Sequence, residues 1–219
     1  MVKIGVVLSG CGVNDGAEIH ESVIALLALD RAGATVVFMA PNKDQMDVVD
    51  HLAGEPAGES RNVLVESARI ARGEIVDVAT VQAADLDGVI VPGGFGAAKN
   101  LCNFATQGDG CEADPDVARL LVDMHGARKP IGAICIAPAL VARVLGEHKP
   151  TLTIGTDAGT AGALEKMGAR HQDCAVQDCV VDAEKKIVTT PAYMLAGSIK
   201  EAADGIEKLV GEVVRLAGG

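Results

Sequence analysis

The sequence predicts a single α/β domain, with a mostly parallel sheet covered by helices on both faces. Short apolar, β-branched runs alternate with longer segments of helical period along the chain. The 219 residues suit one large domain, and 49% of them are hydrophobic, which is enough for a sizeable core. No linker, internal repeat or low-complexity segment divides the chain, so we expect one domain over residues 1–219.

The first half of the chain predicts three strands and two helices. The expected strands are residues 3–8, 35–40 and 88–91, and the expected helices are residues 18–32 and 60–72. Glycine at position 33 ends the first of these helices. Its spacing predicts an apolar face formed by Ile19, Val23, Leu26 and Leu27.

The second half continues the alternation and adds a hairpin. A helix at 114–127 precedes a strand at 131–135, and Pro138 opens a helix at 138–145, where proline costs little in the first turn. The remaining expectations are a helix at 158–167, a hairpin of 179–182 with 187–190, and a closing helix at 198–216.

Composition excludes several kinds of partner. The net charge of −11 and an aromatic content of 2% do not suit nucleic-acid binding, which needs basic and stacking side chains. Neither a bilayer-spanning run nor a cleaved signal is apparent, so we expect a cytoplasmic protein that binds no membrane. The six cysteines form no CxxC pair, which predicts reduced thiols. His171, Cys174 and Cys179 match no zinc spacing, and no metal is expected.

Three loops are expected at the carboxyl edge of the sheet, where ligands bind in open α/β folds. They are SGCGVNDG, PGGFGAAKN and CIAP. In the third loop, Cys135 lies between a strand and a helix N-terminus, among the small residues Gly132, Ala133 and Ala137. Such a turn would lower the thiol pKa and produce a nucleophile. The alternative is a small buried apolar residue, and this stretch alone leaves both open.

The glycine loop favours a site for negative charge. The backbone N–H groups of Gly93, Gly94 and Gly96, with that of Ile136, could form an oxyanion hole. The alternative is a glycine-rich turn without a ligand. The loop lacks the GK[ST] ending of a Walker motif and the glycine spacing of a dinucleotide fingerprint.

The blocks VIVPGGFGAAKN and GAICIAP resemble the class I glutamine amidotransferase-like superfamily, in the branch of PfpI-type peptidases and the Parkinsonism-associated deglycase. Together with KIGVVLSGCGVNDGAEIHES and KIVTTPAYMLA, they are similar to the enhancing-lycopene-biosynthesis (ElbB) family, also described as glyoxalases. The resemblance covers nearly the whole chain. It implies a flavodoxin-like fold, a homodimer and a link to isoprenoid biosynthesis.

The resemblance also implies site residues. Cys135 would occupy a nucleophile elbow, Glu21 on the first helix would contact its thiol, and the N–H groups of Gly94 and Ile136 would form the oxyanion hole. From the residues alone, Glu21 lies opposite the apolar stripe of its helix and suits a solvated carboxylate. Glu18 and His20 are competing candidates.

Histidine is missing where the wider superfamily has it. The stretch TTPAYMLAG, before the last helix, contains no histidine. Residues 153–159, TIGTDAG, contain none either. His171 and Asp173 have a suitable spacing but precede the expected hairpin. Because amide hydrolysis needs a group to protonate the leaving amine, we do not expect it here.

The leading hypothesis is a glutathione-independent glyoxalase that converts glyoxal or methylglyoxal to a 2-hydroxy acid. Cys135 would add to the aldehyde, and Glu21 or another base would move a proton between the two carbons. This chemistry needs no metal or organic cofactor. The alternatives are a redox-sensing or regulatory protein with a reactive cysteine, and a deglycase acting on glycated amines or thiols.

Overall fold

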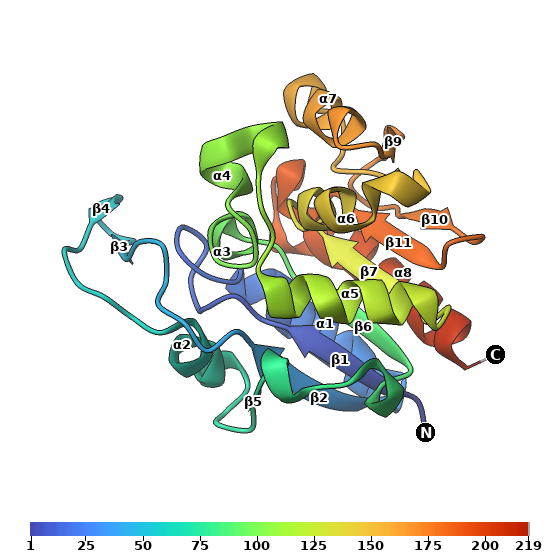
Figure 1. Cartoon of the computed structure of the whole chain (residues 1–219), viewed down its shortest axis with the longest axis horizontal. Helices are drawn as coiled ribbons and strands as arrows, with labels where there is room; N and C mark the ends of the chain where they lie inside the picture. Colours follow the sequence, from blue (N-terminus) through green and yellow to red (C-terminus); the bar gives the residue numbers. More distant parts are fainter. Residues whose placement is uncertain (219) are drawn as a thin grey trace.

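A seven-stranded sheet forms the centre of the computed structural model, which describes residues 1–218 (Figure 1). Its strand order is β10-β11-β7-β6-β1-β2-β5, and all neighbours are parallel except β10 and β11. The strands are β1 (Lys3–Val7), β2 (Thr35–Ala40), β5 (Val76–Asp77), β6 (Gly88–Val91), β7 (Ile131–Ile134), β10 (Val180–Asp182) and β11 (Ile187–Thr190). The predicted fold class is confirmed.

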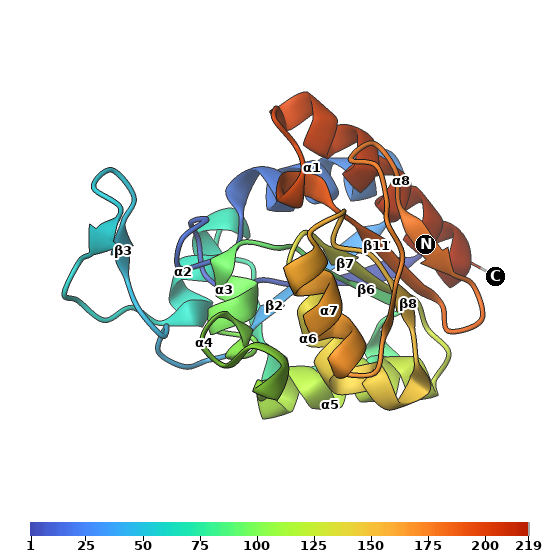
Figure 2. The same cartoon turned by 90° about the horizontal axis from the view of Figure 1, so that it is seen from above.

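Helices cover both faces of this sheet, as the view in Figure 2 shows. On one face, α1 (Ile19–Arg31) packs against α8 (Ile199–Ala217), whose residues Leu209 and Val213 are fully buried. The opposite face is covered by α3 (Phe95–Lys99), α5 (Pro115–Gly126) and α6 (Pro138–Leu145). The remaining helices are α2 (Val63–Ile70), α4 (Phe104–Gln107) and α7 (Ala158–Lys166). Among residues 1–218, no helix combines the length and apolar character that a membrane span requires.

Side-chain caps fix where several helices begin. Asp114 accepts hydrogen bonds from the backbone N–H groups of Asp116 and Val117, and Pro115 occupies the first turn of α5. Asn62 caps α2 by accepting from the N–H of Val65, so this helix starts three residues after the position expected for it. The caps account for the close agreement of α5 with its predicted range and for the shorter α2.

The apolar face predicted for α1 is wrong for three of its four residues, whereas Leu26 is partly buried against the core. Ile19, Val23 and Leu27 are 43%, 50% and 45% exposed, whereas Glu21 and Ser22 are buried together with Ala25 and Leu29. The helix therefore presents a mixed polar and apolar face to the sheet. The helix carries apolar side chains on both faces, so hydrophobic spacing alone selects the wrong one. This orientation carries Glu21 into the interior.

Two small sheets lie outside the central one and were not predicted. β3 (Val49–Asp50) and β4 (Glu55–Pro56) form an antiparallel hairpin on the segment between β2 and α2. This segment projects from the body of the protein (Figures 1 and 2). Leu52, at its turn, is 99% exposed. The second small sheet pairs β8 (Thr151–Leu152) with β9 (Arg170–His171) in parallel.

Candidate active site

The predicted loops meet at the carboxyl edge of the sheet around a cavity of about 330 Å³. Parallel strands bring the ends of β1, β6 and β7 together at this edge. The cavity is lined by Val13, Glu18, Gly94, Phe95, Cys135, Ile136, Thr160, Tyr193 and Met194. Each of the three loops supplies at least one of these residues, so this cavity is the candidate active site.

Cys135 occupies a tight turn between β7 and α6. Its backbone has a φ of +62°, a conformation that residues other than glycine rarely adopt and that often occurs at functional sites. The N–H of Cys135 donates to the carbonyl of Thr190 at 2.9 Å, which holds the turn on β11. The backbone N–H groups of Gly94 and Ile136 act to lower the pKa of its thiol. The side chain is 8% exposed, at the wall of the cavity.

The glycine loop lies so close to this turn that side chains would not fit. A Cβ on Gly93 would lie 2.5 Å from Cys135 Cβ and 2.6 Å from Glu21 Oε2. Gly94 has a φ of +88°, and a Cβ there would lie 2.4 Å from the backbone nitrogen of Glu18. The absence of side chains on these glycines thus allows the Gly93 N–H to reach the carboxyl group of Glu21 and the loop to lie against Cys135.

Glu21 is fully buried beside Cys135, with 0% of its surface exposed. Its Oε2 accepts from the N–H of Gly93 at 2.9 Å, and its Oε1 accepts from the N–H of Tyr193 at 3.3 Å. Its carboxyl group lies beside the Cys135 side chain, since Glu21 Oε2 and Cys135 Cβ would both lie within 2.6 Å of a Cβ placed on Gly93. The expectation of a solvated carboxylate is therefore wrong, because α1 turns this face toward the sheet.

The two competing residues have different places. Glu18 caps α1, since its Oε2 accepts from the N–H of Glu21 at 2.6 Å, and it also lines the cavity. His20 points toward Tyr193, and its Nδ1 lies 2.7 Å from the phenol oxygen. Of the three candidates, Glu21 is the one whose side chain is buried beside Cys135.

The electrostatics of the pair differ from the sequence-based expectation. Burial and the neighbouring Glu18 carboxylate raise the pKa of Glu21 to about 8, so Glu21 keeps its proton at neutral pH. Burial and Glu21 also raise the pKa of the Cys135 thiol well above its ordinary value. The N–H groups of Gly94 and Ile136 act in the opposite direction but are outweighed. The expected lowering of the thiol pKa is thus wrong for the resting site.

Tyr193 is a site residue that the sequence analysis missed. It lines the cavity within TTPAYMLAG, the stretch that lacks the expected histidine. The sequence offered one indication: Tyr193 is the chain's single tyrosine and lies within one of the blocks that carried the family resemblance. His20, which comes from α1, is the histidine that the fold brings next to it.

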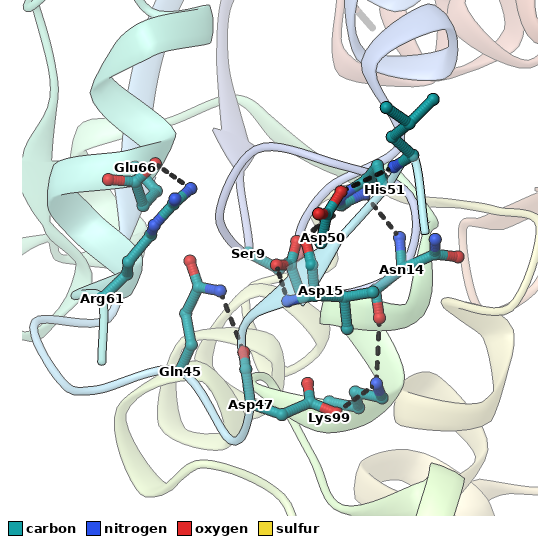
Figure 3. Close-up of polar contacts among 12 residues, drawn as sticks. Ser9, Asn14, Asp15, Gln45, Asp47, Asp50, His51, Arg61, Glu66 and Lys99 are labelled. Carbon is teal, nitrogen blue, oxygen red and sulfur yellow. Dashed lines mark hydrogen bonds and ion pairs between the residues drawn. The ribbon is translucent and has the colours of Figure 1, made fainter. Parts of the chain in front are cut away.

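The first loop is held by a polar network that reaches the projecting segment (Figure 3). Asp15 accepts from the N–H of Val49 at 2.8 Å, and the N–H of Asn14 donates to His51 Nε2 at 3.1 Å. Lys99 Nζ donates to the carbonyl of Asn14 at 2.9 Å and to the carboxylate of Asp47 at 2.7 Å. These bonds fix the loop that places Val13 at the cavity.

The other candidates from the sequence do not contribute to this cavity. His171 lies in β9, where its Nε2 is 3.4 Å from the N–H of Ile154, and Asp173 is a neighbour at 3.7 Å. Within residues 1–218, no group of three or more His, Cys, Asp or Glu side chains is arranged to hold a metal ion. Burial raises the pKa of Cys11, the thiol of the first loop, and this residue does not line the cavity.

The fold and the cysteine turn define a class I glutamine amidotransferase-like protein. The chain is 48% identical over 226 residues to the human protein "Glutamine amidotransferase-like class 1 domain-containing protein 3, mitochondrial", covering 99% of this chain and 84% of the relative. It is 47% identical to the rat "ES1 protein homolog, mitochondrial", with the same coverage. The chain belongs to the ES1 family of these proteins. No family model matches it.

A solved structure supports the same assignment. The crystal structure of an "isoprenoid biosynthesis protein with amidotransferase-like domain" from Ehrlichia chaffeensis superposes with a TM-score of 0.93 at 39% identity. The match covers 99% of each chain. The resemblance to the ElbB family is confirmed, and this chain is a homologue of a protein named for isoprenoid biosynthesis.

The expectation of a cytoplasmic protein is contradicted by these comparisons. The human and rat relatives, each matched over 99% of this chain, are named as mitochondrial proteins. Composition and the first residues carried that expectation, and neither reports the compartment directly. The localisation inferred from them is therefore wrong.

Proposed function

We propose that the protein is a glutathione-independent glyoxalase acting on glyoxal or methylglyoxal. The observation that carries the proposal is the buried pair of Cys135 and Glu21, of which Cys135 lines a cavity. A nucleophile, an adjacent acid–base group and backbone donors are the parts that a proton shift within a dicarbonyl compound requires. No cofactor has a role in this chemistry.

The cavity favours an uncharged substrate. Its lining residues include the carboxylate of Glu18 but no lysine, arginine or histidine. Lys99, which lies 5.5 Å from the centre of the Phe95 ring, is bound by Asp47. An anionic substrate would meet Glu18 without a compensating cation, whereas glyoxal and methylglyoxal carry no charge.

The reacting form arises when the Cys135–Glu21 pair loses its first proton. Ionising both acids would place two adjacent negative charges in a buried site, which is energetically unfavourable. The pair therefore shares a single negative charge. The N–H groups of Gly94 and Ile136 favour that charge on sulfur while Glu21 holds the proton. The thiolate then adds to the aldehyde carbon, and the aldehyde oxygen takes the proton of Glu21. Glu21 is left as the carboxylate that can remove the hydrogen on that carbon.

The later steps return the pair to its starting state. Glu21 carries the hydrogen from the first carbon to the second, which converts the hemithioacetal into a thioester of the 2-hydroxy acid. Water gives a proton to the Glu21 carboxylate as it attacks the thioester, the C–S bond breaks, and the Cys135 thiolate leaves. The N–H groups of Gly94 and Ile136, which favour negative charge on the sulfur, would also stabilise the oxygen that becomes negative during this hydrolysis.

A rate comparison tests the proposal. Wild-type protein and Cys135→Ser are supplied with glyoxal without glutathione, and hydroxy acid is measured. We expect Cys135→Ser to lose turnover and Glu21→Gln to lose about a hundredfold or more, in the range for lost general base catalysis. Glu165→Gln, at an exposed position on α7, is the matched control and retains activity. Equal rates in wild type and Cys135→Ser would refute the assignment.

A homodimer is proposed on separate grounds. Ile19, Val23 and Leu27 form an exposed apolar stripe along α1, at spacings of four residues. Such a stripe is costly to leave in water and suits packing against a second copy of the same helix. It explains why α1 has apolar residues on the face that points away from the sheet.

A further inference from the structure

Two consecutive residues of α1 hold Tyr193. His20 Nδ1 lies 2.7 Å from the phenol oxygen, and Glu21 Oε1 accepts from the Tyr193 backbone N–H at 3.3 Å. The His20 and Tyr193 rings lie 5.8 Å apart at 48°, so the contact is made through the hydrogen bond rather than by stacking. The sequence separation of 173 residues shows that the fold, not local chain geometry, creates this arrangement.

The backbone before Tyr193 is strained in a way that fixes this position. Ala192 is fully buried with a φ of +42°, in the left-handed region that alanine seldom occupies. It begins a short 3-10 turn, Ala192–Met194, which is separated from β11 by Pro191 alone. Such conformations persist where the surroundings hold them, and they concentrate at functional sites. The turn presents both Tyr193 and Met194 to the cavity.

The residues assigned so far do not protonate the second carbonyl oxygen in the proposed chemistry. Removing the hydrogen from the first carbon pushes electrons onto the oxygen of the second carbonyl, which must be protonated or hydrogen-bonded. Glu21 is then occupied with the carbon-bound hydrogen, and the N–H groups of Gly94 and Ile136 lie at the sulfur. Tyr193 lines the same cavity, and its hydroxyl oxygen is hydrogen-bonded to His20.

We propose that Tyr193 is a catalytic acid of the Cys135 site and that His20 is its positioning residue. The inference rests on the proposed glyoxalase function and extends it. When His20 donates its Nδ1–H to the phenol oxygen, the phenol O–H is free to donate to substrate. Burial, followed by the charges of Glu18 and Glu21, raises the pKa of Tyr193, which keeps this proton in place at neutral pH.

The proton shift leaves both acids, Glu21 and Tyr193, in the forms in which they entered it. Glu21 takes the hydrogen of the first carbon as a proton, and the electron pair of that C–H bond forms a double bond to the second carbon. The π electrons of the second carbonyl move to its oxygen, which takes the Tyr193 proton. When the enediol collapses to the thioester, the hydroxyl on the first carbon gives its proton back to Tyr193, and Glu21 delivers its proton to the second carbon. Each acid ends as it began.

The test uses Tyr193→Phe, which keeps the ring, and His20→Asn, with His148→Asn as a control on the remote surface histidine. Three quantities are measured with the full-length protein: kcat for glyoxal, the effect of dideuterated glyoxal on kcat, and the rate at which iodoacetamide alkylates Cys135 at pH 9. Alkylation reports whether the thiol site is intact, and the isotope effect reports whether removal of the carbon-bound hydrogen limits the rate.

We expect Tyr193→Phe to lower kcat by about a hundredfold, since a positioned acid contributes that much or more. Its isotope effect should rise above that of wild type, while alkylation of Cys135 stays within about twofold. His20→Asn should lose about tenfold, as for one net hydrogen bond, and His148→Asn should lose nothing.

Two results would overturn this role. One is a kcat for Tyr193→Phe within about twofold of wild type. The other is a loss of kcat with an unchanged isotope effect and an equal loss of alkylation, which would make Tyr193 purely structural. Either result leaves the proposed glyoxalase in place if the wild type turns over. A wild type without turnover refutes the proposed function itself, and the role of Tyr193 falls with it.

Discussion

Replacing Glu21 by glutamine should change the pH dependence of stability in a specific direction. The carboxyl group is fully buried, and its pKa is raised from an ordinary 4.5 to about 8. Between these two values the folded protein binds a proton that the unfolded chain releases. Stability is therefore lost as the pH rises from 4.5 to 8. Glutamine has a similar shape and does not titrate, so the variant escapes this loss.

The magnitude follows from the displacement of the pKa. At 1.36 kcal/mol for each pH unit, a pKa raised from 4.5 to about 8 corresponds to about 5 kcal/mol in full. Between pH 5 and pH 8 the variant should gain about 3 to 4 kcal/mol relative to wild type. A constant cost of about 1–3 kcal/mol opposes this gain if the glutamine leaves the N–H of Gly93 without an acceptor.

The assay is urea unfolding under reducing conditions at pH 5, 6, 7 and 8, with the free energy of unfolding extrapolated to water. Glu21→Gln should be equal to or less stable than wild type at pH 5 and more stable at pH 8. Glu165→Gln, on the surface of α7, controls for removing a carboxylate. A difference that stays constant with pH, or that grows toward acid, would show that Glu21 does not hold a proton at neutral pH.

Three further predictions concern the site and its surroundings. Turnover should rise with pH through an apparent pKa of about 8, as the Cys135–Glu21 pair loses its first proton, and a flat profile from pH 6 to 9 would contradict this. Gly93→Ala should lower kcat by about a hundredfold or more, because its Cβ would lie within 2.6 Å of both reacting groups, and a rate near wild type would be inconsistent with the loop geometry. Leu27→Glu should reduce the mass seen in light scattering to that of a monomer, while Val122→Glu on α5 should not. An unchanged mass in Leu27→Glu would exclude the α1 stripe as the interface.

Much of the fold could be predicted from local hydrophobic patterns in the sequence. Buried strands such as β6 and β7 are short apolar runs, and the parallel arrangement follows from their alternation with helices. The hairpin between β10 and β11 was also predicted. The projecting β3–β4 hairpin could not be predicted, because its strands have two residues each and its side chains are mostly exposed. Two residues are too few to show the alternation of apolar and polar side chains that identifies a strand.

The candidate site was predictable only where the local sequence around a residue determines its position. Cys135 could be placed from its position between a strand and a proline-initiated helix. The environment of Glu21 could not, because the apolar residues of α1 suggested the opposite face for burial. The raised pKa values depend on that burial and could not be predicted without it. Tyr193 joins His20 across 173 residues, a proximity that no local pattern encodes.

The most direct test of the account counts product molecules per active site. Purified wild-type protein is incubated with excess glyoxal, without glutathione, metal or nucleotide, and glycolate is quantified by NMR against the concentration of Cys135. The proposed mechanism regenerates the thiolate in every cycle, so the ratio should rise steadily far beyond one, and Cys135→Ser should form none. A burst of one equivalent with a stable adduct on Cys135 would contradict the account, because the thiol would then react with the dicarbonyl without catalysing its conversion.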